Sequence, residues 1–334
     1  MIATKVDCLQ ELKQCKSELI VHARHMQHAA KLHGVVRTKI LIPNSLPQVL
    51  MLLGPARIGK SHLLKDLEAE FGRIEVTPTG RQKKLLYVRV PEGGGAIATM
   101  TEILRCLGEP YKTTKSDELM ARVQKRLQAL GVQVVILDDV HHFADEGRKA
   151  SVRAGSDILK GLIELNPEVT MIFAGIPLAS RLREENPQVR GRCDAPDYYL
   201  PYCWDDVEQR NDFISAVFPV YNVVSQAMEF EELEANRFIS GMYLLGGGCF
   251  GFVMKFMEAI INILEQKEDG GLLTKSDLAE AFRRKARDTT YIVNPFENFD
   301  TVTEPMLIEA WKQVMTEEGL ARFITAGTLV GAKI

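Results

Sequence analysis

The chain has 334 residues, of which 46% are hydrophobic and 25% are charged, and its formal net charge is −3. This composition is typical of a soluble globular protein long enough for two domains, and it excludes a uniformly positive surface as the means of binding nucleic acid. Any DNA contact must therefore come from local basic patches. The six cysteines form no C-x-x-C pair and no secretory signal opens the chain, so we expect reduced thiols in a cytoplasmic protein.

The N-terminal segment is polar. Its pattern predicts one helix over residues 7–33, in which His22, His25 and His28 recur at a spacing of three and fall near one face. We expect a solvated helix face there. A metal site is the alternative, and it would need a further ligand from elsewhere in the chain. Residues 1–45 are interpreted as an N-terminal helical extension.

From residue 46 onward, apolar runs alternate with helical patterns. Strands are predicted at 48–53, 85–90, 132–137, 169–174 and 197–200, and helices at 60–71, 97–107, 116–130 and 151–165. This alternation predicts an α/β domain over residues 46–201, with a mostly parallel sheet and helices on both faces.

After Pro201 the strand pattern stops. Helices are predicted at 204–218, 229–244, 249–267 and 274–287, which indicates a helical domain over residues 202–293. The long apolar stretch at 241–264 includes Lys255 and Glu258, so it predicts a buried helix and no membrane span. Residues 294–334 are interpreted as a C-terminal tail outside the core, with an amphipathic helix at 304–318 that would bind a partner.

The strongest motif follows the first predicted strand. It fits the phosphate-binding pattern G-x-x-x-x-G-K-[ST] at every fixed position, and a helix follows it. The glycines let backbone N–H groups surround the phosphates of a nucleotide at the positive end of that helix. Lys60 would neutralise the β- and γ-phosphates and Ser61 would hold Mg²⁺. The residues predicted to bind the nucleotide are Gly54, Pro55, Ala56, Arg57, Ile58, Gly59, Lys60, Ser61 and His62.

Two acidic residues follow the third core strand. P-loop enzymes hold Mg²⁺ with the first acidic residue at this place, so Asp138 is assigned to the metal. Asp139 would polarise the attacking water as a catalytic residue. Its side chain is one methylene shorter than the usual glutamate, which predicts slow hydrolysis because the carboxylate is drawn back from the water. A capping role for Asp139 is the alternative.

Together, the P-loop, the acidic strand end and the helical module resemble an AAA+ ATPase. Several later segments resemble, more narrowly, the transposition ATPases of the TniB/TnsC family, and the similarity runs from about residue 35 to 296. These segments are 138–143 (D-E-x-H-N-L in the family), 147–149 and 172–179 (G-T-R-x-Q and I-x-x-x-G-T-x-x-A), 187–193 (Q-L-x-x-R-F), 200–204 (L-P-R-W) and 294–296 (N-P-F).

The resemblance implies a regulator of DNA transposition that binds ATP and Mg²⁺ and forms homo-oligomeric rings or filaments on duplex DNA. It also implies two protein partners, a transposase and a target-selection protein of the TniQ/TnsD type. Arg192 matches the arginine of Q-L-x-x-R-F and would reach the γ-phosphate bound by a neighbouring subunit, with Arg190 as the second candidate. Solvated loop arginines are the alternative.

The chain departs from the family pattern in ways that also predict slow hydrolysis. Ile176 stands where a polar residue usually senses the γ-phosphate, and Lys255 is the nearest basic residue to the place of a lid arginine. Neither departure weakens the prediction of nucleotide binding.

Duplex DNA is predicted to contact basic residues on segments that leave the core between the nucleotide motifs. Each subunit needs few phosphate contacts, because an oligomer multiplies them. The basic clusters at 81–84 and 283–287 are further candidates, and a solvated face is the alternative for every cluster. The predicted DNA contacts are Lys112, Lys115, Arg148, Lys149 and Arg153.

Three alternative functions remain open from the sequence. One is a helicase loader or replication initiator of the same AAA+ class. Another is a nucleotide-locked scaffold, meaning a protein that keeps its bound nucleotide and does not hydrolyse it at a useful rate. The third is a small-molecule kinase, against which the helical module and the loop carrying Arg190 and Arg192 both argue.

Overall fold

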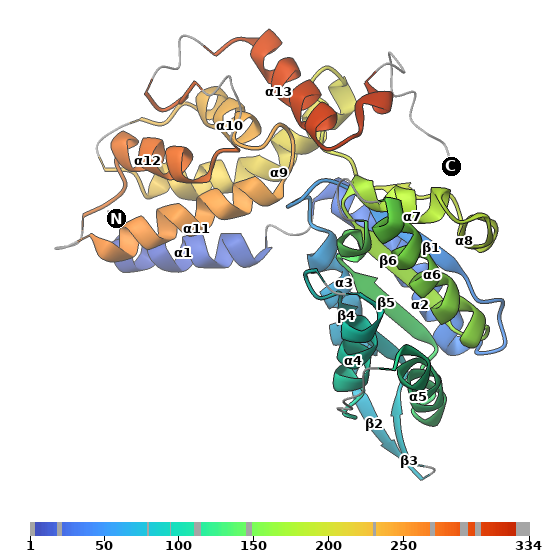
Figure 1. The fold of residues 1–334 in the computed structure, drawn as a ribbon. Helices are drawn as coiled ribbons and strands as arrows, with labels where there is room; N and C mark the ends of the chain where they lie inside the picture. Colours follow the sequence, from blue (N-terminus) through green and yellow to red (C-terminus); the bar gives the residue numbers. More distant parts are fainter. Residues whose placement is uncertain are drawn as a thin grey trace. The chain divides into compact units, whose positions relative to one another are not determined.

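The protein was analysed as a computed structural model (Figure 1). It describes residues 4–18, 22–78, 80–93, 95–109, 115–144, 149–229, 232–267, 271–287, 293–297 and 302–324, with only the backbone at 149–151. The chain divides into two compact units: residues His28–Tyr199 form an α/β unit, and Met1–Gln27 together with Leu200–Ile334 form a helical unit. The N-terminal 45 residues are therefore not a unit of their own.

The α/β unit contains a five-stranded parallel sheet, as predicted. Its strand order is β4-β5-β6-β1-β7, and flanking helices pack on it (Figure 1). The strands are β1 (Val49–Leu53), β4 (Leu85–Arg89), β5 (Val134–Asp138), β6 (Thr170–Gly175) and β7 (Asp197–Tyr198). The central strands β5 and β6 are aliphatic-rich and buried along their whole length, because helices cover both faces of a parallel sheet.

The helices of this unit are α2 (Ala23–Leu41), which begins in the helical unit, α3 (Lys60–Phe71), α4 (Ala96–Cys106), α5 (Ser116–Ala129), α6 (Lys149–Leu165), α7 (Ser180–Glu184) and α8 (Pro187–Arg192), with the 3-10 turns η1 (Val140–Phe143) and η2 (Pro177–Ala179). Four helices of this unit, α3 to α6, lie close to their predicted positions. Helices α7 and α8 were not predicted. Each is too short for a hydrophobic period to develop.

The sequence also failed to predict a hairpin between α3 and β4. Strands β2 (Ile74–Thr77) and β3 (Gly80–Lys83) pair in antiparallel register and extend away from the main sheet (Figure 1). Their residues are polar or exposed, so they lack the buried face that makes a strand recognisable from its pattern.

The predicted helix over 7–33 is wrong, because it is two helices, α1 (Lys5–Glu18) and α2. The histidine face is not solvated either. His22 and His25 are only 6% and 7% exposed, and His22 Nδ1 lies 2.8 Å from the Tyr202 hydroxyl. In the α/β unit, His28 stacks on the Tyr199 ring. Within the described ranges no three His, Cys, Asp or Glu side chains are grouped to hold a metal ion.

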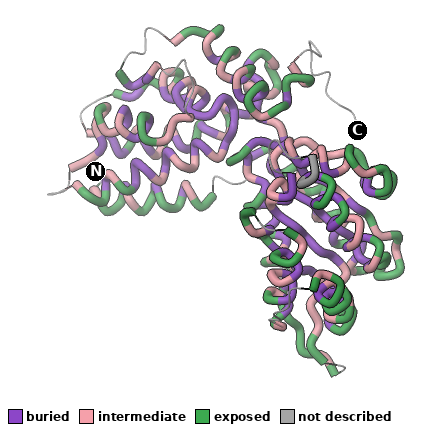
Figure 2. The backbone as a smooth tube through the Cα atoms, viewed as in Figure 1, coloured by how far each residue is buried: buried purple, intermediate pink, exposed green. Residues whose placement is uncertain are grey.

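The helical unit is built around buried aromatic side chains. Phe213 and Tyr243 pack edge to face, and Phe256 stacks on Phe296 (buried segments are purple in Figure 2). Among the described residues, no helix combines the length and apolarity that crossing a bilayer requires. With α1, its helices are α9 (Val207–Gln226), α10 (Ala235–Leu244), α11 (Gly251–Gln266), α12 (Lys275–Lys285) and α13 (Glu304–Glu317), followed by the turn η4 (Ala321–Phe323).

The prediction that residues 294–334 lie outside the core is wrong for the part of this segment that the structure describes. Helix α13 buries Leu307, Trp311, Val314 and Met315. Arg287, beyond the end of α12, forms ion pairs with Glu317 and Glu318 at 3.0 and 2.8 Å. The amphipathic pattern of this segment therefore reflects packing within its own unit.

Candidate nucleotide-binding site

The P-loop begins with Gly54, which is held between two other backbone segments. The N–H of Gly54 donates to the Gly175 carbonyl at the end of β6 (3.2 Å), and the N–H of Tyr199 donates to the Leu53 carbonyl (2.7 Å). A Cβ atom at position 54 would lie 2.3 Å from the carbonyl oxygen of Tyr199. Glycine is therefore required here for close backbone approach, independently of any ligand.

Gly54→Ala should destabilise the protein by about 3 kcal/mol, the upper end for overpacking, because the obstacle is a backbone carbonyl between two strands and not the end of a flexible side chain. Gly34→Ala is the matched control, since Gly34 is exposed within α2 and a Cβ there meets nothing within 4 Å. It should stabilise the protein by about 0.5–1 kcal/mol through helix propensity. Urea unfolding gives the free energy of unfolding of both variants. Equal values would contradict the argument that no Cβ fits at position 54.

The second half of the loop turns sharply into α3. Arg57 and Gly59 both adopt left-handed backbone conformations, with φ of 62° and 118°. Gly59 is the N-cap residue of α3, and its carbonyl accepts hydrogen bonds from the N–H groups of His62 and Leu63. The first N–H groups of a helix have no carbonyl within the helix to bond, which makes this terminus suited to phosphate oxygens.

Lys60 lies across the loop, and its predicted contact with phosphates stays a prediction. Its side chain is buried, and its Nζ donates to the carbonyls of Gly54 and Pro55 at 2.7 and 2.8 Å. Ile58 is also buried, and it anchors the loop to the core. Ser61 and His62 are exposed at the start of α3. The loop backbone thus positions the ammonium group, and the helix presents the serine hydroxyl.

Asp138 ends β5 and is fully buried. Its Oδ2 accepts a hydrogen bond from the Tyr87 hydroxyl and its Oδ1 accepts one from the N–H of Asp139, both at 2.9 Å. Burial, and then the adjacent Asp138 carboxylate, raise the pKa of Tyr87 well above its usual value, so the phenol remains a proton donor. These bonds orient the carboxylate.

The residues present fit Mg²⁺ as it is bound in phosphoryl-transfer sites. The Ser61 hydroxyl and the oriented Asp138 carboxylate offer the oxygen ligands that Mg²⁺ prefers. In such sites one or two protein ligands suffice, because water and nucleotide phosphates complete the octahedron.

Asp139 is held by an arginine that sequence reasoning missed. Arg89, the last residue of β4, donates from Nε to Asp139 Oδ2 at 2.6 Å. Asp139 has a left-handed backbone (φ 59°), and its side chain makes no capping bond to η1, so the alternative capping role is not observed. Arg89 and Asp138 are direct partners in the parallel register of β4 and β5, which brings the arginine to the acidic pair.

His141 is a second residue that the sequence analysis did not single out. Its Nδ1 is buried, has no hydrogen-bond partner within the described residues, and lies 4.0 Å from Asp139 Oδ1. Burial, and then the neighbouring His142, lower the pKa of His141, so its imidazole is neutral at pH 7. This Nδ1 lies close to Gly175 at the end of β6, since a Cβ atom added to that glycine would be 3.4 Å from it. His141 therefore places a polar atom beside the residue that precedes Ile176.

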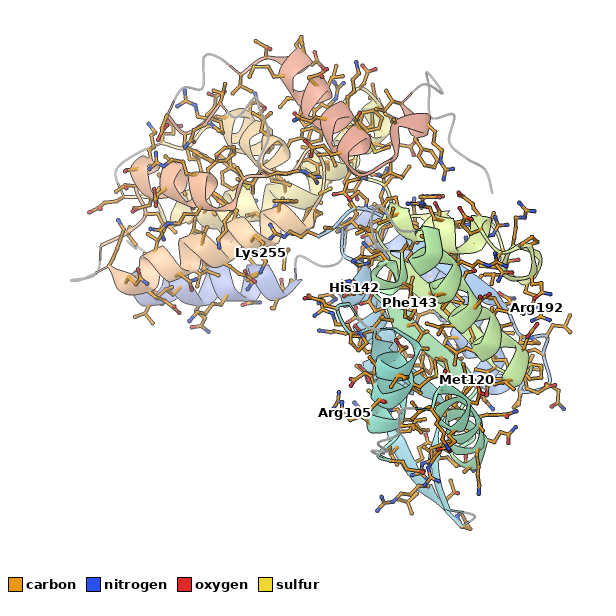
Figure 3. The ribbon with its side chains drawn as sticks, in the orientation of Figure 1. Arg105, Met120, His142, Phe143, Arg192 and Lys255 are labelled. Atoms are coloured by element: carbon orange, nitrogen blue, oxygen red, sulfur yellow. The ribbon has the colours of Figure 1, made fainter. Side chains whose placement is uncertain are left out.

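The predicted trans-acting arginines lie on α8. Arg192 is 44% exposed and pairs with Glu164 of α6 at 3.1 Å, and its side chain extends from the outer side of the α/β unit (Figure 3). Arg190 is exposed on the same helix. In the helical unit, Lys255 pairs with Glu258 of the same helix at 2.8 Å. The roles of all three toward a nucleotide stay predictions.

The predicted DNA contacts are only partly described. Lys115 precedes α5 and pairs with Glu118 at 3.1 Å, while Arg153 is exposed on α6. Lys112, Arg148 and the side chain of Lys149 lie outside the described residues. The structure therefore leaves these contacts as predictions.

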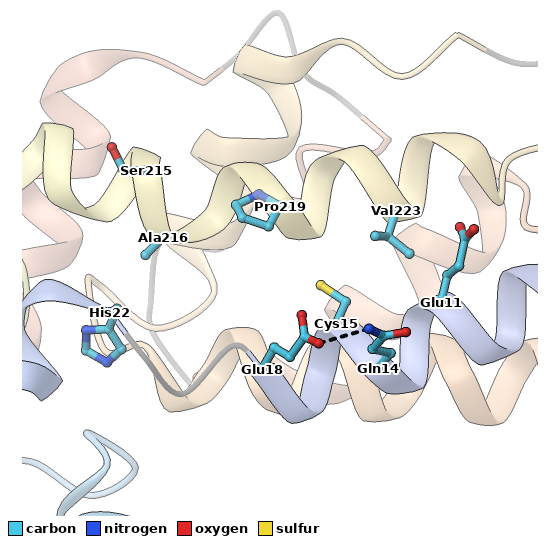
Figure 4. Close-up of a pocket in the computed structure, with 9 residues that line it drawn as sticks. All are labelled: Glu11, Gln14, Cys15, Glu18, His22, Ser215, Ala216, Pro219 and Val223. Carbon is cyan, nitrogen blue, oxygen red and sulfur yellow. Dashed lines mark hydrogen bonds between the residues drawn. The ribbon is translucent and has the colours of Figure 1, made fainter.

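A pocket of about 430 Å³ lies elsewhere, between α1 and α9 of the helical unit (Figure 4). Glu11, Glu18 and Cys15 line one side and Pro219 the other. None of the residues predicted to bind nucleotide lines it. This pocket is therefore separate from the candidate nucleotide-binding site.

Comparison with known proteins agrees with the geometry. The family described as bacterial TniB protein matches residues 12–198. The ORC2 protein of Aeropyrum pernix, in its ADPNP–ADP complexes, has a TM-score of 0.54 at 14% identity and covers 94% of this chain and 88% of its own. Cdc6p from Pyrobaculum aerophilum has a TM-score of 0.55 at 14% identity, with coverages of 90% and 82%. Comparison with curated proteins gives no match.

These findings confirm the predicted fold and the predicted family. At 14% identity, the solved structures establish the fold alone, which is that of AAA+ P-loop ATPases. The family match spans more than half of the chain and includes the P-loop, Asp138 and Asp139. The chain therefore belongs to the TniB family.

Proposed function

We propose that this protein is an ATP-dependent, DNA-binding regulator of transposition. It assembles into homo-oligomers on duplex DNA and links a target-selection protein of the TniQ/TnsD type to a transposase, with slow ATP hydrolysis as the switch. The observation that carries the proposal is an intact P-loop, with Lys60 held across it, in a chain of the TniB family.

The site residues have separate roles in nucleotide binding and hydrolysis. The N–H groups at the start of α3 and the Lys60 ammonium bind the β- and γ-phosphates. Ser61 and Asp138 would hold Mg²⁺, which would supply positive charge to the phosphates. Asp139 orients the attacking water. Its Oδ2 is bonded to Arg89 at 2.6 Å, and Oδ1 offers a second carboxylate oxygen that can accept a hydrogen bond from water.

Assembly into an oligomer supplies one more positive charge to the bound phosphates, from an arginine of the adjacent subunit. The Arg192–Glu164 pair is solvent-exposed on both sides, and such surface pairs contribute only about 0–1 kcal/mol. Arg192 can therefore exchange this carboxylate for a phosphate bound by the adjacent subunit. A trans arginine stabilises charge on the transferring phosphoryl group and makes hydrolysis depend on the oligomer.

The test is electron microscopy of the purified chain with duplex DNA and either ATP or a non-hydrolysable analogue. Rings or filaments that require nucleotide and DNA, and that Lys60→Ala abolishes, would support the proposal. Monomers under every condition would overturn it and favour a small-molecule kinase.

A nucleotide-locked scaffold is the second candidate, and the Arg89–Asp139 pair together with Ile176 favours it. Asp139→Glu should raise ATP turnover about tenfold in a working ATPase, because a displacement of about 1 Å can cost up to 100-fold in rate. Asp139→Asn is the control, and it should remove turnover without changing nucleotide affinity. If neither wild type nor Asp139→Glu releases phosphate above the Asp139→Asn background, the scaffold is the correct description.

A further inference from the structure

The β2–β3 hairpin has two chemically different faces. In its register Ile74 pairs with Lys83 and Val76 with Arg81, while Glu75 pairs with Gln82. Directly paired residues point to the same side of an antiparallel ribbon, and successive residues alternate sides. Ile74, Val76, Arg81 and Lys83 therefore share one face, named here the cationic face.

The cationic face is exposed to solvent. Ile74 is 58% exposed and Val76 is 84% exposed, and the hairpin is mostly green in Figure 2. Arg81 is exposed, and Lys83 is partly buried at the base of the hairpin. Within the described residues neither Arg81 nor Lys83 takes part in an ion pair. Two partly or fully exposed aliphatic side chains thus share this face with two cations that form no ion pair in the described part of the chain.

The charge of the hairpin is opposite to that of the chain. Residues 73–84 contain four basic residues and one acidic residue, whereas the net charge of the whole protein is −3. By contrast, Arg283 and Arg284 at the end of α12 both pair with Glu280 of their own unit. The hairpin is therefore a local basic patch of the kind that an acidic DNA-binding protein requires.

We propose that the cationic face of the β2–β3 hairpin binds duplex DNA, with Arg81 and Lys83 on phosphates and Ile74 and Val76 against the groove. This inference rests on the proposed function, and it adds a surface to the predicted contacts at Lys112, Lys115, Arg148, Lys149 and Arg153.

The geometry of the hairpin favours DNA over an acidic protein. A two-stranded ribbon fits the major groove of B-DNA, which is about 12 Å wide. Arg81 and Lys83 are separated by about 6.8 Å along β3, so they reach different phosphates. Small aliphatic side chains between cations suit contact with thymine methyl groups and sugars. A protein interface would instead place an apolar core inside a polar rim, and this narrow face has no such core.

The experiment compares full-length variants in fluorescence anisotropy with a labelled DNA duplex, at saturating nucleotide and several salt concentrations. Arg81→Ala with Lys83→Ala should weaken DNA binding at least tenfold. It should also reduce the slope of log K against log salt by about 1.8, because each lost phosphate contact removes about 0.9. Ile74→Ser with Val76→Ser should weaken binding and leave the slope unchanged.

The matched control is Lys125→Ala with Lys312→Ala, which removes the same charge from exposed positions on α5 and α13. All variants should retain wild-type nucleotide affinity and thermal unfolding, which shows that each one folds. If wild type binds duplex and the Arg81/Lys83 variant matches it in affinity and slope, the hairpin inference is overturned while the proposed function stands, and an acidic protein becomes the partner for this face. If wild type binds no duplex, both fail.

Discussion

Lys60→Ala should abolish ATP turnover, with a loss of about 100- to 1000-fold relative to wild type. The Lys60 ammonium is buried, and backbone carbonyls of the loop fix its position, so we expect it to stabilise phosphate charge from a preset position. Nucleotide affinity should fall as well, because we expect the lysine to contact the phosphates already in the ground state. Phosphate release and fluorescent-nucleotide titration measure the two effects.

Lys65→Ala provides the matched control, since Lys65 lies one turn further along α3 and is exposed. It should behave like wild type in both assays. Both variants should unfold near the wild-type temperature, because the two hydrogen bonds lost in Lys60→Ala contribute only about 1 kcal/mol each. Turnover by Lys60→Ala within tenfold of wild type would show that phosphates bind somewhere other than this loop.

Truncation after residue 297 should prevent the helical unit from folding. Helix α13 buries Leu307, Trp311, Val314 and Met315, and burying each large apolar side chain contributes about 1.5–3 kcal/mol. Their combined loss is comparable with the whole stability of a typical domain, about 5–15 kcal/mol. The truncated chain should aggregate or lose cooperative unfolding, as measured by circular dichroism.

Point variants in α13 test whether its buried side chains, and not only the length of the chain, stabilise the helical unit. Trp311→Ala should destabilise the protein by about 3–5 kcal/mol. Trp311→Phe should cost much less, because the indole Nε1 is buried without a hydrogen-bond partner in the described part of the chain. Lys312→Ala, at the exposed neighbouring position, should be neutral. A truncated protein with an unchanged melting temperature would restore the interpretation of this segment as a separate tail.

The sequence alone determined the features that depend on local chemistry. The P-loop was recognisable because its function needs fixed residue types at fixed spacing, and α3 begins at Lys60 as predicted. The buried parallel strands were recognisable because both faces of each strand are apolar. Asp138 could be placed at the end of a core strand for the same reason.

Only the tertiary structure decided which distant residues meet. Arg89 and Tyr87 contact the acidic pair because β4 and β5 are neighbours in the sheet, although α4 and α5 separate them in the sequence. The burial of His22 and the packing of α13 likewise depend on partners far along the chain. A hydrophobic period shows that a helix has an apolar face, but it does not show which surface covers that face. That choice depends on packing among all the elements of a unit, which no local pattern encodes.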